Sequence, residues 1–340
     1  MGEALLAMGK RAAMIIGAMN STALAASDLA LGTPVAVRLA EWGVIRARGD
    51  DAAAFLNGQL TQETIKLDVG QARLAGYCSP KGRLLASFVA WRTAADEILL
   101  ACSADLLAPT LKRLSMFVLR ARCKLTDASG EIGLWGVALP GLLHDSAEHP
   151  VPQAPYGTTA VGGGTAIRLA DAAGSTRLLW AAPVDATPPW ATTTSADVWN
   201  WLEVQSGVPR IVASTVEAFV PQMINLELVG GVNFQKGCYP GQEVVARSQY
   251  RGTLKRRMVL AEGAAAAAGA EVFAAADPAQ PAGQVVLSAS LPHPEGGARH
   301  AALIEVKRAL AEAGELHVGA PDGPLLRLRE LPYEIPADVA

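Results

Sequence analysis

The chain has 340 residues, enough for about two or three domains, and it is 51% hydrophobic against 18% charged. That balance supplies a sizeable core and excludes an intrinsically disordered protein. With 29 Lys and Arg against 32 Asp and Glu, the formal net charge is −3. A protein that holds nucleic acid by charge over its whole surface is therefore not expected.

The cysteines and histidines show no metal-binding spacing. Cys78, Cys102, Cys123 and Cys238 lie far apart in the sequence, with no CxxC pair, and the five histidines form no HExxH pattern. We therefore predict neither a resident metal site nor a disulfide framework.

The first thirty residues have the layout of a secretory signal. Lys10 and Arg11 precede a short apolar run at 12–19, and Ala-Leu-Ala follows at 23–25. In-frame methionines at positions 8, 14 and 19 offer the alternative of an over-long start. In either case we expect residues 1–33 to be an extension, and no apolar stretch is long enough to span a membrane.

After Pro34 the chain shows the pattern of a mixed α+β layer. Short apolar stretches with strand character are joined by polar turns, and two stretches have apolar residues at helical spacing. We expect strands at 44–49, 74–78, 83–91 and 98–102, a turn at 79–82, and helices at 52–56, capped by Asp50 and Asp51, and at 105–119. This order predicts helices packed on an antiparallel sheet.

Two loop regions and a helix follow. Residues 140–165 end in a Gly triplet, and because no Lys follows the triplet we interpret the region as a linker, not a phosphate-binding loop. Residues 186–191 form a second loop. A helix is expected at 196–207, stopped by Gly207 and Pro209.

The residue pattern changes after residue 255, where short apolar stretches alternate with Gly and Pro turns. Strands are expected at 257–261, 271–274, 283–289, 301–306, 315–318 and 325–328. Six short strands at regular spacing predict a small antiparallel barrel. We therefore divide the chain into an extension at 1–33, an α+β region at 34–255 and a barrel at 256–332.

One segment carries the strongest functional signal, FQKGCYPGQEVVARSQYRG at residues 234–252. Gly237 and Gly241 bracket a tight turn and let the backbone approach a ligand closely. Pro240 suits the first turn of the helix that follows, and Gln242 and Glu243 add polar groups there.

Cys238 is expected at or just before the N-terminus of that helix. Unpaired N–H groups and the helix dipole favour a thiolate at this place, as does Lys236. The alternative is a small buried hydrophobic residue, but the flanking residues favour a functional thiol. Because no His stands nearby in the sequence, cluster ligation, a mixed disulfide and reaction with a one-carbon unit all remain open.

Cations gather after the cysteine: Arg247, Arg251, Lys255, Arg256 and Arg257. From the residues alone, a solvated face is the preferred interpretation. The alternative is that they hold an anionic ligand tail or the phosphates of an RNA.

The 234–252 segment resembles the signature of the YgfZ family, KGCYxGQExVAR followed by a YRG-like turn. These proteins are folate-binding relatives of the glycine-cleavage T-protein. Residues 49–61, 77–83 and 206–226 also resemble family segments. The resemblance covers most of residues 40–260, with a weaker match of the barrel to about residue 330.

The resemblance implies a two-part α+β folate-binding fold around a central cleft, with a C-terminal antiparallel β-barrel. It implies tetrahydrofolate or a one-carbon derivative in the cleft, and a role in assembling or maintaining iron–sulfur enzymes, including those that modify tRNA. Residues at matching positions become cofactor-binding candidates beside Cys238: Lys236, Gly237, Tyr239, Gly241, Gln242, Glu243, Arg247, Arg251, Gln59, Thr61, Gln205, Gln222 and Asn225.

The same resemblance weakens an aminomethyltransferase assignment. Leu85 and Ala86 stand where the T-protein family has its reacting acid. Gln205 stands where that family has a Glu that grips the pterin, and Glu203, two residues earlier, is expected to point elsewhere on a helix.

We therefore predict a cytoplasmic folate-binding accessory protein with iron–sulfur client enzymes as partners, not a conventional enzyme. One alternative is a folate-dependent one-carbon transferase or demethylase. The other is a factor that binds RNA, such as tRNA, through the cationic residues between 247 and 257.

Overall fold

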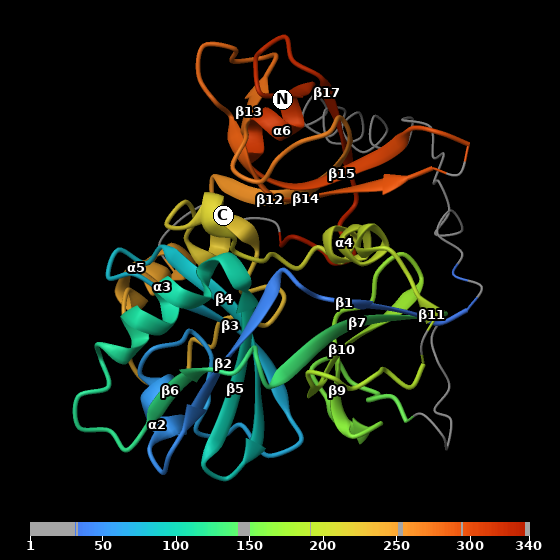
Figure 1. Ribbon diagram of the computed structural model, residues 1–340. Helices are drawn as coiled ribbons and strands as arrows, with labels where there is room; N and C mark the ends of the chain where they lie inside the picture. Colours follow the sequence, from blue (N-terminus) through green and yellow to red (C-terminus); the bar gives the residue numbers. More distant parts are fainter. Residues whose placement is uncertain are drawn as a thin grey trace, which may run out of the picture.

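The computed structural model describes residues 31, 33–141, 150–190, 192–250, 254–293 and 295–336. The expected signal or over-long start within residues 1–30 lies outside them, and so does Arg251. The described chain forms two antiparallel-rich sheets with covering helices and a closed barrel, drawn in orange and red above the sheets in Figure 1.

The first sheet has the strand order β3-β4-β5-β2-β6 and is antiparallel throughout. Its strands are β2 (Trp42–Arg48), β3 (Ala72–Cys78), β4 (Leu84–Ala94), β5 (Glu97–Ser103) and β6 (Lys124–Asp127). Helices α2 (Ala52–Asn57) and α3 (Ala104–Ser115) cover it. Phe55, Leu56 and Leu107 from these helices join the apolar core on that side of the sheet.

The second sheet has the order β11-β1-β7-β10-β9-β8. Its strands are β1 (Val35–Arg38), β7 (Ile132–Pro140), β8 (Thr158–Val161), β9 (Gly164–Arg168), β10 (Ser175–Pro183) and β11 (Thr192–Thr193). Val89, Trp91 and Leu99 of the first sheet pack with Ile167 and Leu179 of the second. The two sheets therefore share one core, and a cleft forms where this contact ends.

Six antiparallel strands close the C-terminal barrel in the order β12-β15-β14-β13-β16-β17. They are β12 (Arg256–Gly263), β13 (Glu271–Ala274), β14 (Gly283–Pro292), β15 (Ala298–Lys307), β16 (Leu316–Val318) and β17 (Leu325–Arg329), with α6 (Arg308–Ala313) after β15. Each lies where alternating apolar residues and Gly or Pro turns place a strand. The predicted α+β fold with a C-terminal barrel is confirmed.

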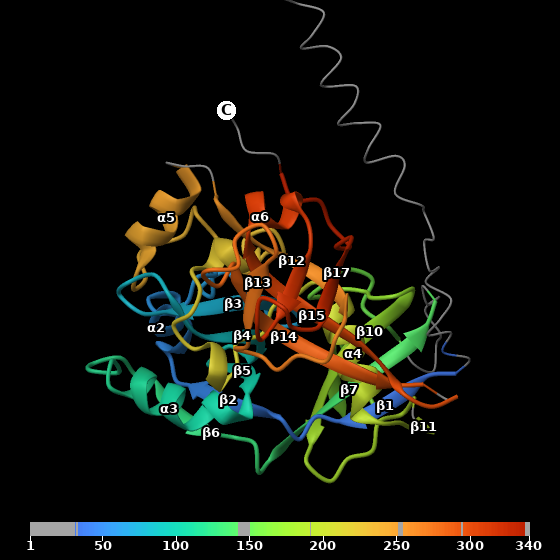
Figure 2. The same cartoon turned by 90° about the horizontal axis from the view of Figure 1, so that it is seen from above.

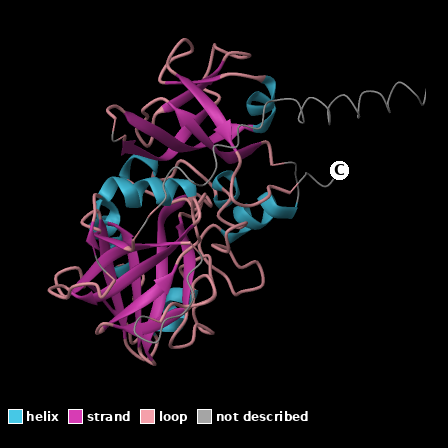
Figure 3. Ribbon diagram, turned by 90° about the vertical axis from the view of Figure 1, so that its right-hand side faces the viewer, coloured by secondary structure: helices cyan, strands magenta, loops and turns pink. Residues whose placement is uncertain are grey.

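Helix α4 (Ala196–Gln205) runs between the barrel and the sheets (Figure 3). Trp201 and Val204 pack with Leu287 and Leu303 of the barrel, whereas Trp199 joins the core between the sheets. Two single-turn 3₁₀ helices, η2 (Ala213–Thr215) and η3 (Pro221–Ile224), and helix α5 (Gln242–Tyr250) complete the described elements. Because α4 contacts both sheets and the barrel, residues near its C-terminal end lie where these three parts meet.

Two sequence expectations are wrong. The helix expected to reach residue 119 ends at Ser115. The amides of Phe117 and Val118 bond carbonyls three residues back, as in a tightened last turn that is not continued. The loop expected over 140–165 contains β8 and the start of β9, because Gly162 and Gly163 supply the positive φ values of a two-residue hairpin turn.

No helix among the described residues is long and apolar enough to cross a membrane. The described residues also contain no group of three or more His, Cys, Asp or Glu side chains placed to hold a metal ion.

Candidate functional site

The loop that carries Cys238, residues 236–241, is anchored by a buried lysine; we call it the Cys238 loop. The Lys236 ammonium donates to the main-chain oxygens of Asn57 and Leu60, the second at 2.8 Å, and lies 4.8 Å from the centre of the Tyr239 ring. Burial lowers the pKa of Lys236 to about 8, against the opposing influence of Glu63 and Cys238. Lys236 thus fixes the start of the loop to the C-terminal end of α2.

Gly241 fixes the other end of the loop. Its φ is +79°, and a Cβ atom at this position would lie 2.4 Å from the Ser79 oxygen and 2.6 Å from the Gly82 Cα. The backbone therefore touches the β3–β4 turn at a distance only glycine permits. Helix α5 begins one residue later, at Gln242, so Pro240 precedes the helix and does not lie in its first turn.

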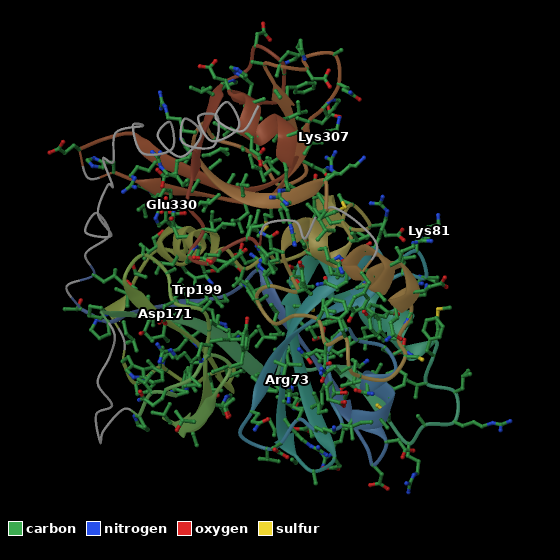
Figure 4. The ribbon with its side chains drawn as sticks, turned by 180° about the vertical axis from the view of Figure 1, so that it is seen from behind. Arg73, Lys81, Asp171, Trp199, Lys307 and Glu330 are labelled. Atoms are coloured by element: carbon green, nitrogen blue, oxygen red, sulfur yellow. The ribbon has the colours of Figure 1, made fainter. Side chains whose placement is uncertain are left out.

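Between these supports, Cys238 is exposed, whereas Cys78 and Cys102 are buried. The exposure excludes the alternative of a small buried hydrophobic residue. Burial raises the pKa of Cys78 to about 12, so that neighbouring thiol stays protonated. In Figure 4, Lys81 of the β3–β4 turn projects from the same side of the molecule as α5. Cys238 is thus the one exposed thiol of the four, and a reagent or partner can reach it.

The other predicted residues of the segment lie around the thiol. Tyr239 is buried against Lys236, and Gly237 is exposed. On α5, Gln242 is half-buried and Glu243 and Arg247 are exposed. The structure therefore brings these residues together in one surface loop and helix.

Three of four further candidates form side-chain hydrogen bonds inside the protein. Thr61 donates to the Gly231 oxygen and accepts from the Gly76 amide, and Gln222 donates to the Val245 oxygen at 2.8 Å. Asn225 donates to the Met258 oxygen. Gln59 is half-buried, and its side-chain oxygen is enclosed with no hydrogen-bond partner. The bonds of Thr61, Gln222 and Asn225 show how these residues support the fold around the Cys238 loop.

A separate narrow cleft, with a volume of about 30 Å³, lies where the two sheets meet α4. Trp42, Phe88 and Tyr156 form apolar walls, and Ser87 adds a hydroxyl. Its charged residues are Arg177, Glu203 and Arg210. Cys238 is not among the described residues that line this cleft, so thiol and cleft are distinct places in the molecule.

Glu203 and Arg210 form a closed ion pair in the cleft wall. The Arg210 Nε and Nη2 atoms donate to the two Glu203 oxygens at 2.8 and 2.9 Å, and Nη1 donates to the Ser103 hydroxyl at 3.0 Å. Both side chains are buried. This bidentate geometry neutralises the carboxylate.

Arg177 is the remaining cation of the cleft and is 2% exposed. One of its terminal nitrogens donates to the Ala170 oxygen, and the guanidinium lies 4.5 Å from the centre of the Trp199 ring. Its Nε atom is buried with no hydrogen-bond partner. Burial lowers the pKa of Arg177 to about 10, so the guanidinium stays charged at neutral pH. The cleft therefore has positive charge available for a ligand.

The expectation that Glu203 points away from the cleft is wrong. Glu203 lines the cleft, whereas the Gln205 amide donates to Glu262 of β12 at 3.3 Å. Residues two apart on a helix project in very different directions, so only one of the two can face the cleft.

The predicted cationic cluster is also divided. Arg257 is buried and paired with Glu227, and Arg256 makes two bonds to Glu305. Neither is free for an external phosphate, which corrects their assignment to a cationic surface. Arg247 and Lys255 are exposed.

Comparison with known proteins decides the family. The chain is 30% identical over 261 residues to the tRNA-modifying protein YgfZ of Photobacterium profundum, covering 72% of this chain and 75% of that protein. It is 31% identical over 253 residues to the protein of the same name from Edwardsiella ictaluri, covering 67% and 71%. The chain belongs to the YgfZ family.

The fold of this YgfZ-family protein is similar to a crystal structure of the glycine cleavage system aminomethyltransferase T from Bartonella henselae. The TM-score is 0.65 with 15% identity, over 88% of this chain and 86% of that one. No family model matches the chain. The membership of the YgfZ family and the T-protein-like fold, both expected from the sequence, are therefore confirmed.

Sequence reasoning missed Arg177 and Arg210, the two cations of the cleft in this YgfZ-family chain. Arg177 lies on β10, Glu203 on α4 and Arg210 in the following loop, so no local motif joins all three. One signal was present: Glu203 and Arg210 are seven residues apart around the helix stop at Gly207.

Proposed function

We propose that this protein is a cytoplasmic folate-binding accessory factor for the assembly or maintenance of iron–sulfur enzymes, including enzymes that modify tRNA. The observation that carries the proposal is the separation of two features. The exposed thiol of Cys238 lies on a surface loop that is anchored at both ends. An apolar cleft, in which the buried Nε of Arg177 has no hydrogen-bond partner, lies elsewhere. Relatives of this chain are named tRNA-modifying proteins, which supports the tRNA context.

The residues of the cleft fit tetrahydrofolate or a one-carbon derivative. Ligand pockets are mostly apolar and contain a few polar groups that fix orientation. This cleft has aromatic walls from Trp42, Phe88 and Tyr156, and the unpartnered Nε of Arg177 needs a hydrogen-bond acceptor. We assign these residues and Ser87 to the folate. The folate would supply a one-carbon unit or report on its availability.

Aminomethyl transfer is not supported by the same cleft. Glu203 is the one carboxylate among the described residues that line it, and Arg210 already holds both of its oxygens. Leu85 and Ala86, at the positions where the T-protein family has its reacting acid, are a half-buried and a buried apolar residue of β4. A carboxylate free to stabilise charge on a reacting nitrogen is therefore lacking among these residues.

Cys238 carries the client-directed step in this proposal. The residues of the loop hold the thiol at the surface and leave it open to a partner, and Lys236 places a cation beside it. Ligation of a transient cluster and a mixed disulfide both require such an exposed thiol.

The test is complementation of a bacterial strain from which the native homologue has been deleted. The readout is the amount of a tRNA modification that is made by an iron–sulfur enzyme. We expect the full chain to restore the modification and Cys238→Ala to fail at equal protein levels. Cys102→Ala is the matched control, because that buried thiol of β5 lies outside the Cys238 loop. Full activity of Cys238→Ala would overturn the proposal.

A further inference from the structure

The segment from the last turn of α3 to the first residue of β6 is strongly basic. Residues 111–124 contain five cations and no Asp or Glu, in a protein of net charge −3. The cations are Lys112, Arg113, Arg120, Arg122 and Lys124. Lys112, Arg120 and Lys124 are exposed. A run of like charge is usually a solvated face, so the other residues of the loop decide its meaning.

The tip of this loop is apolar and exposed. Met116, Phe117 and Leu119 are 67%, 45% and 85% exposed. A contiguous apolar group surrounded by polar residues is typical of an interaction site, because exposure of such side chains costs free energy until a partner covers them. Phe117 also presents an aromatic face among cations.

The base of the loop is held rigidly. The Arg122 amide donates to the Asp51 carboxylate at 2.8 Å, and the Asp51 amide donates to the Arg122 oxygen at 3.1 Å. A Cβ atom at Gly49 would lie 2.1 Å from that same Arg122 oxygen, so the two chain segments are in contact. The Arg122 side chain pairs with Asp50 and Asp51, which uses up its charge. The exposed residues therefore project from a fixed support.

The loop lies close to the Cys238 loop. Asp51 stands at the N-terminal end of α2, where it holds Arg122, and Asn57 at the C-terminal end accepts from Lys236. A helix of six residues is about 9 Å long. Both loops are thus attached to one short helix, and in Figures 1 and 2 the loop after α3 projects from the side that carries α5.

We propose that the segment at residues 112–124, from the last turn of α3 through the loop to the start of β6, is the surface that binds RNA, with cations on phosphates and Phe117 stacked on an unpaired base. The inference rests on the proposed function for the identity of the RNA as tRNA. Cations beside an exposed aromatic residue are the combination that holds single-stranded segments. Protein interfaces are depleted in Lys, whereas residues 112–124 contain two lysines and no acid. A polyanion is the complementary partner.

This surface replaces the one that the sequence suggested. Arg256 and Arg257 are paired with carboxylates inside the protein, so residues 247–257 offer fewer free cations than their sequence implies. The loop after α3 keeps exposed cations, and it positions a bound RNA next to Cys238.

The test is filter binding of unfractionated bacterial tRNA to the full chain at several salt concentrations. We expect Arg120→Glu to lower the affinity about tenfold at about 0.1 M salt, and to reduce the slope of log K against log salt by about 1. Phe117→Ala should lower the affinity about fivefold with an unchanged slope, because stacking releases no counterion.

Arg327→Glu is the matched control, because Arg327 is an exposed cation of the barrel strand β17. It should bind tRNA like the wild type. Absence of tRNA binding by the wild type would overturn the inference. So would wild-type affinity in both loop variants, or a loss confined to Lys255→Glu, or loop variants that change only the oligomeric state. Folate titration of the same samples reports separately on the proposed function.

Discussion

Gly82 and Gly241 lie back to back, each in space that a side chain on the other would need. A Cβ on Gly241 would approach the Gly82 Cα to 2.6 Å, and a Cβ on Gly82 would lie 2.8 Å from the Val244 Cβ. Both residues have positive φ, +71° and +79°. This contact joins the β3–β4 turn to the start of α5 and thereby fixes the position of the Cys238 loop relative to the first sheet.

Gly241→Ala is expected to lower the free energy of unfolding by about 2–3 kcal/mol, because it adds a backbone clash to the strain of a positive φ. Gly163→Ala separates these effects, since Gly163 has φ +74° with no atom within 4 Å of its Cβ position. That control should cost only about 1 kcal/mol. Urea unfolding measures both variants, and equal losses would contradict the contact.

Lys236 should make stability depend on pH. Its pKa is about 8 in the folded chain against 10.5 for a solvated lysine, so between these values the unfolded chain binds the proton that the folded chain has lost. The free energy of unfolding therefore gains a contribution that rises with pH across this window. Lys236→Met removes it. Urea unfolding at about pH 7 and about pH 9.5 should show the wild type gaining on the variant at the higher pH. A constant difference would contradict the burial of the ammonium.

Arg177→Met is expected to separate ligand binding from stability. Removal of a buried cation with an unpartnered Nε should leave the free energy of unfolding unchanged or raise it by about 1 kcal/mol. Tetrahydrofolate affinity should fall about tenfold or more, which is about 1.4 kcal/mol. Calorimetric titration and urea unfolding measure the two effects. Arg327→Met should change neither, and unchanged folate affinity in Arg177→Met would remove Arg177 from the site.

Glu203→Gln should destabilise the chain strongly. It leaves the Arg210 guanidinium buried without its bidentate partner, and the next carboxylate, Glu41, is 3.8 Å away and half exposed. Breaking a buried pair from one side costs about 3–5 kcal/mol. The double variant Glu203→Gln with Arg210→Met should recover part of that loss in urea unfolding. A single-variant loss below about 1 kcal/mol would show that the pair is screened by water.

The barrel could be predicted strand by strand because each strand carries its own local signal, an apolar alternation between Gly or Pro turns. The second sheet could not. Strands β7 and β10 are buried almost throughout, and a continuous apolar run does not distinguish a strand from a buried helix segment. The β8–β9 hairpin was missed because its Gly turn was interpreted as the end of a linker.

In the candidate site, too, the local features could be predicted from the sequence and the long-range ones could not. The residues of the Cys238 loop are consecutive in the sequence, so its glycines, lysine and thiol could be predicted from the sequence. The cleft joins Arg177 and Arg210, which are brought together by the packing of β10 against α4. The choice between Glu203 and Gln205 depended on the phase of a helix, which a motif match over three residues does not determine.

The most direct test of the account is calorimetric titration of the full chain with tetrahydrofolate, with Cys238→Ala measured beside it. We predict micromolar binding of equal strength in both proteins, because the thiol does not line the cleft. Absence of binding by the wild type would contradict the folate assignment, and binding lost only in Cys238→Ala would contradict the separation of cleft and thiol.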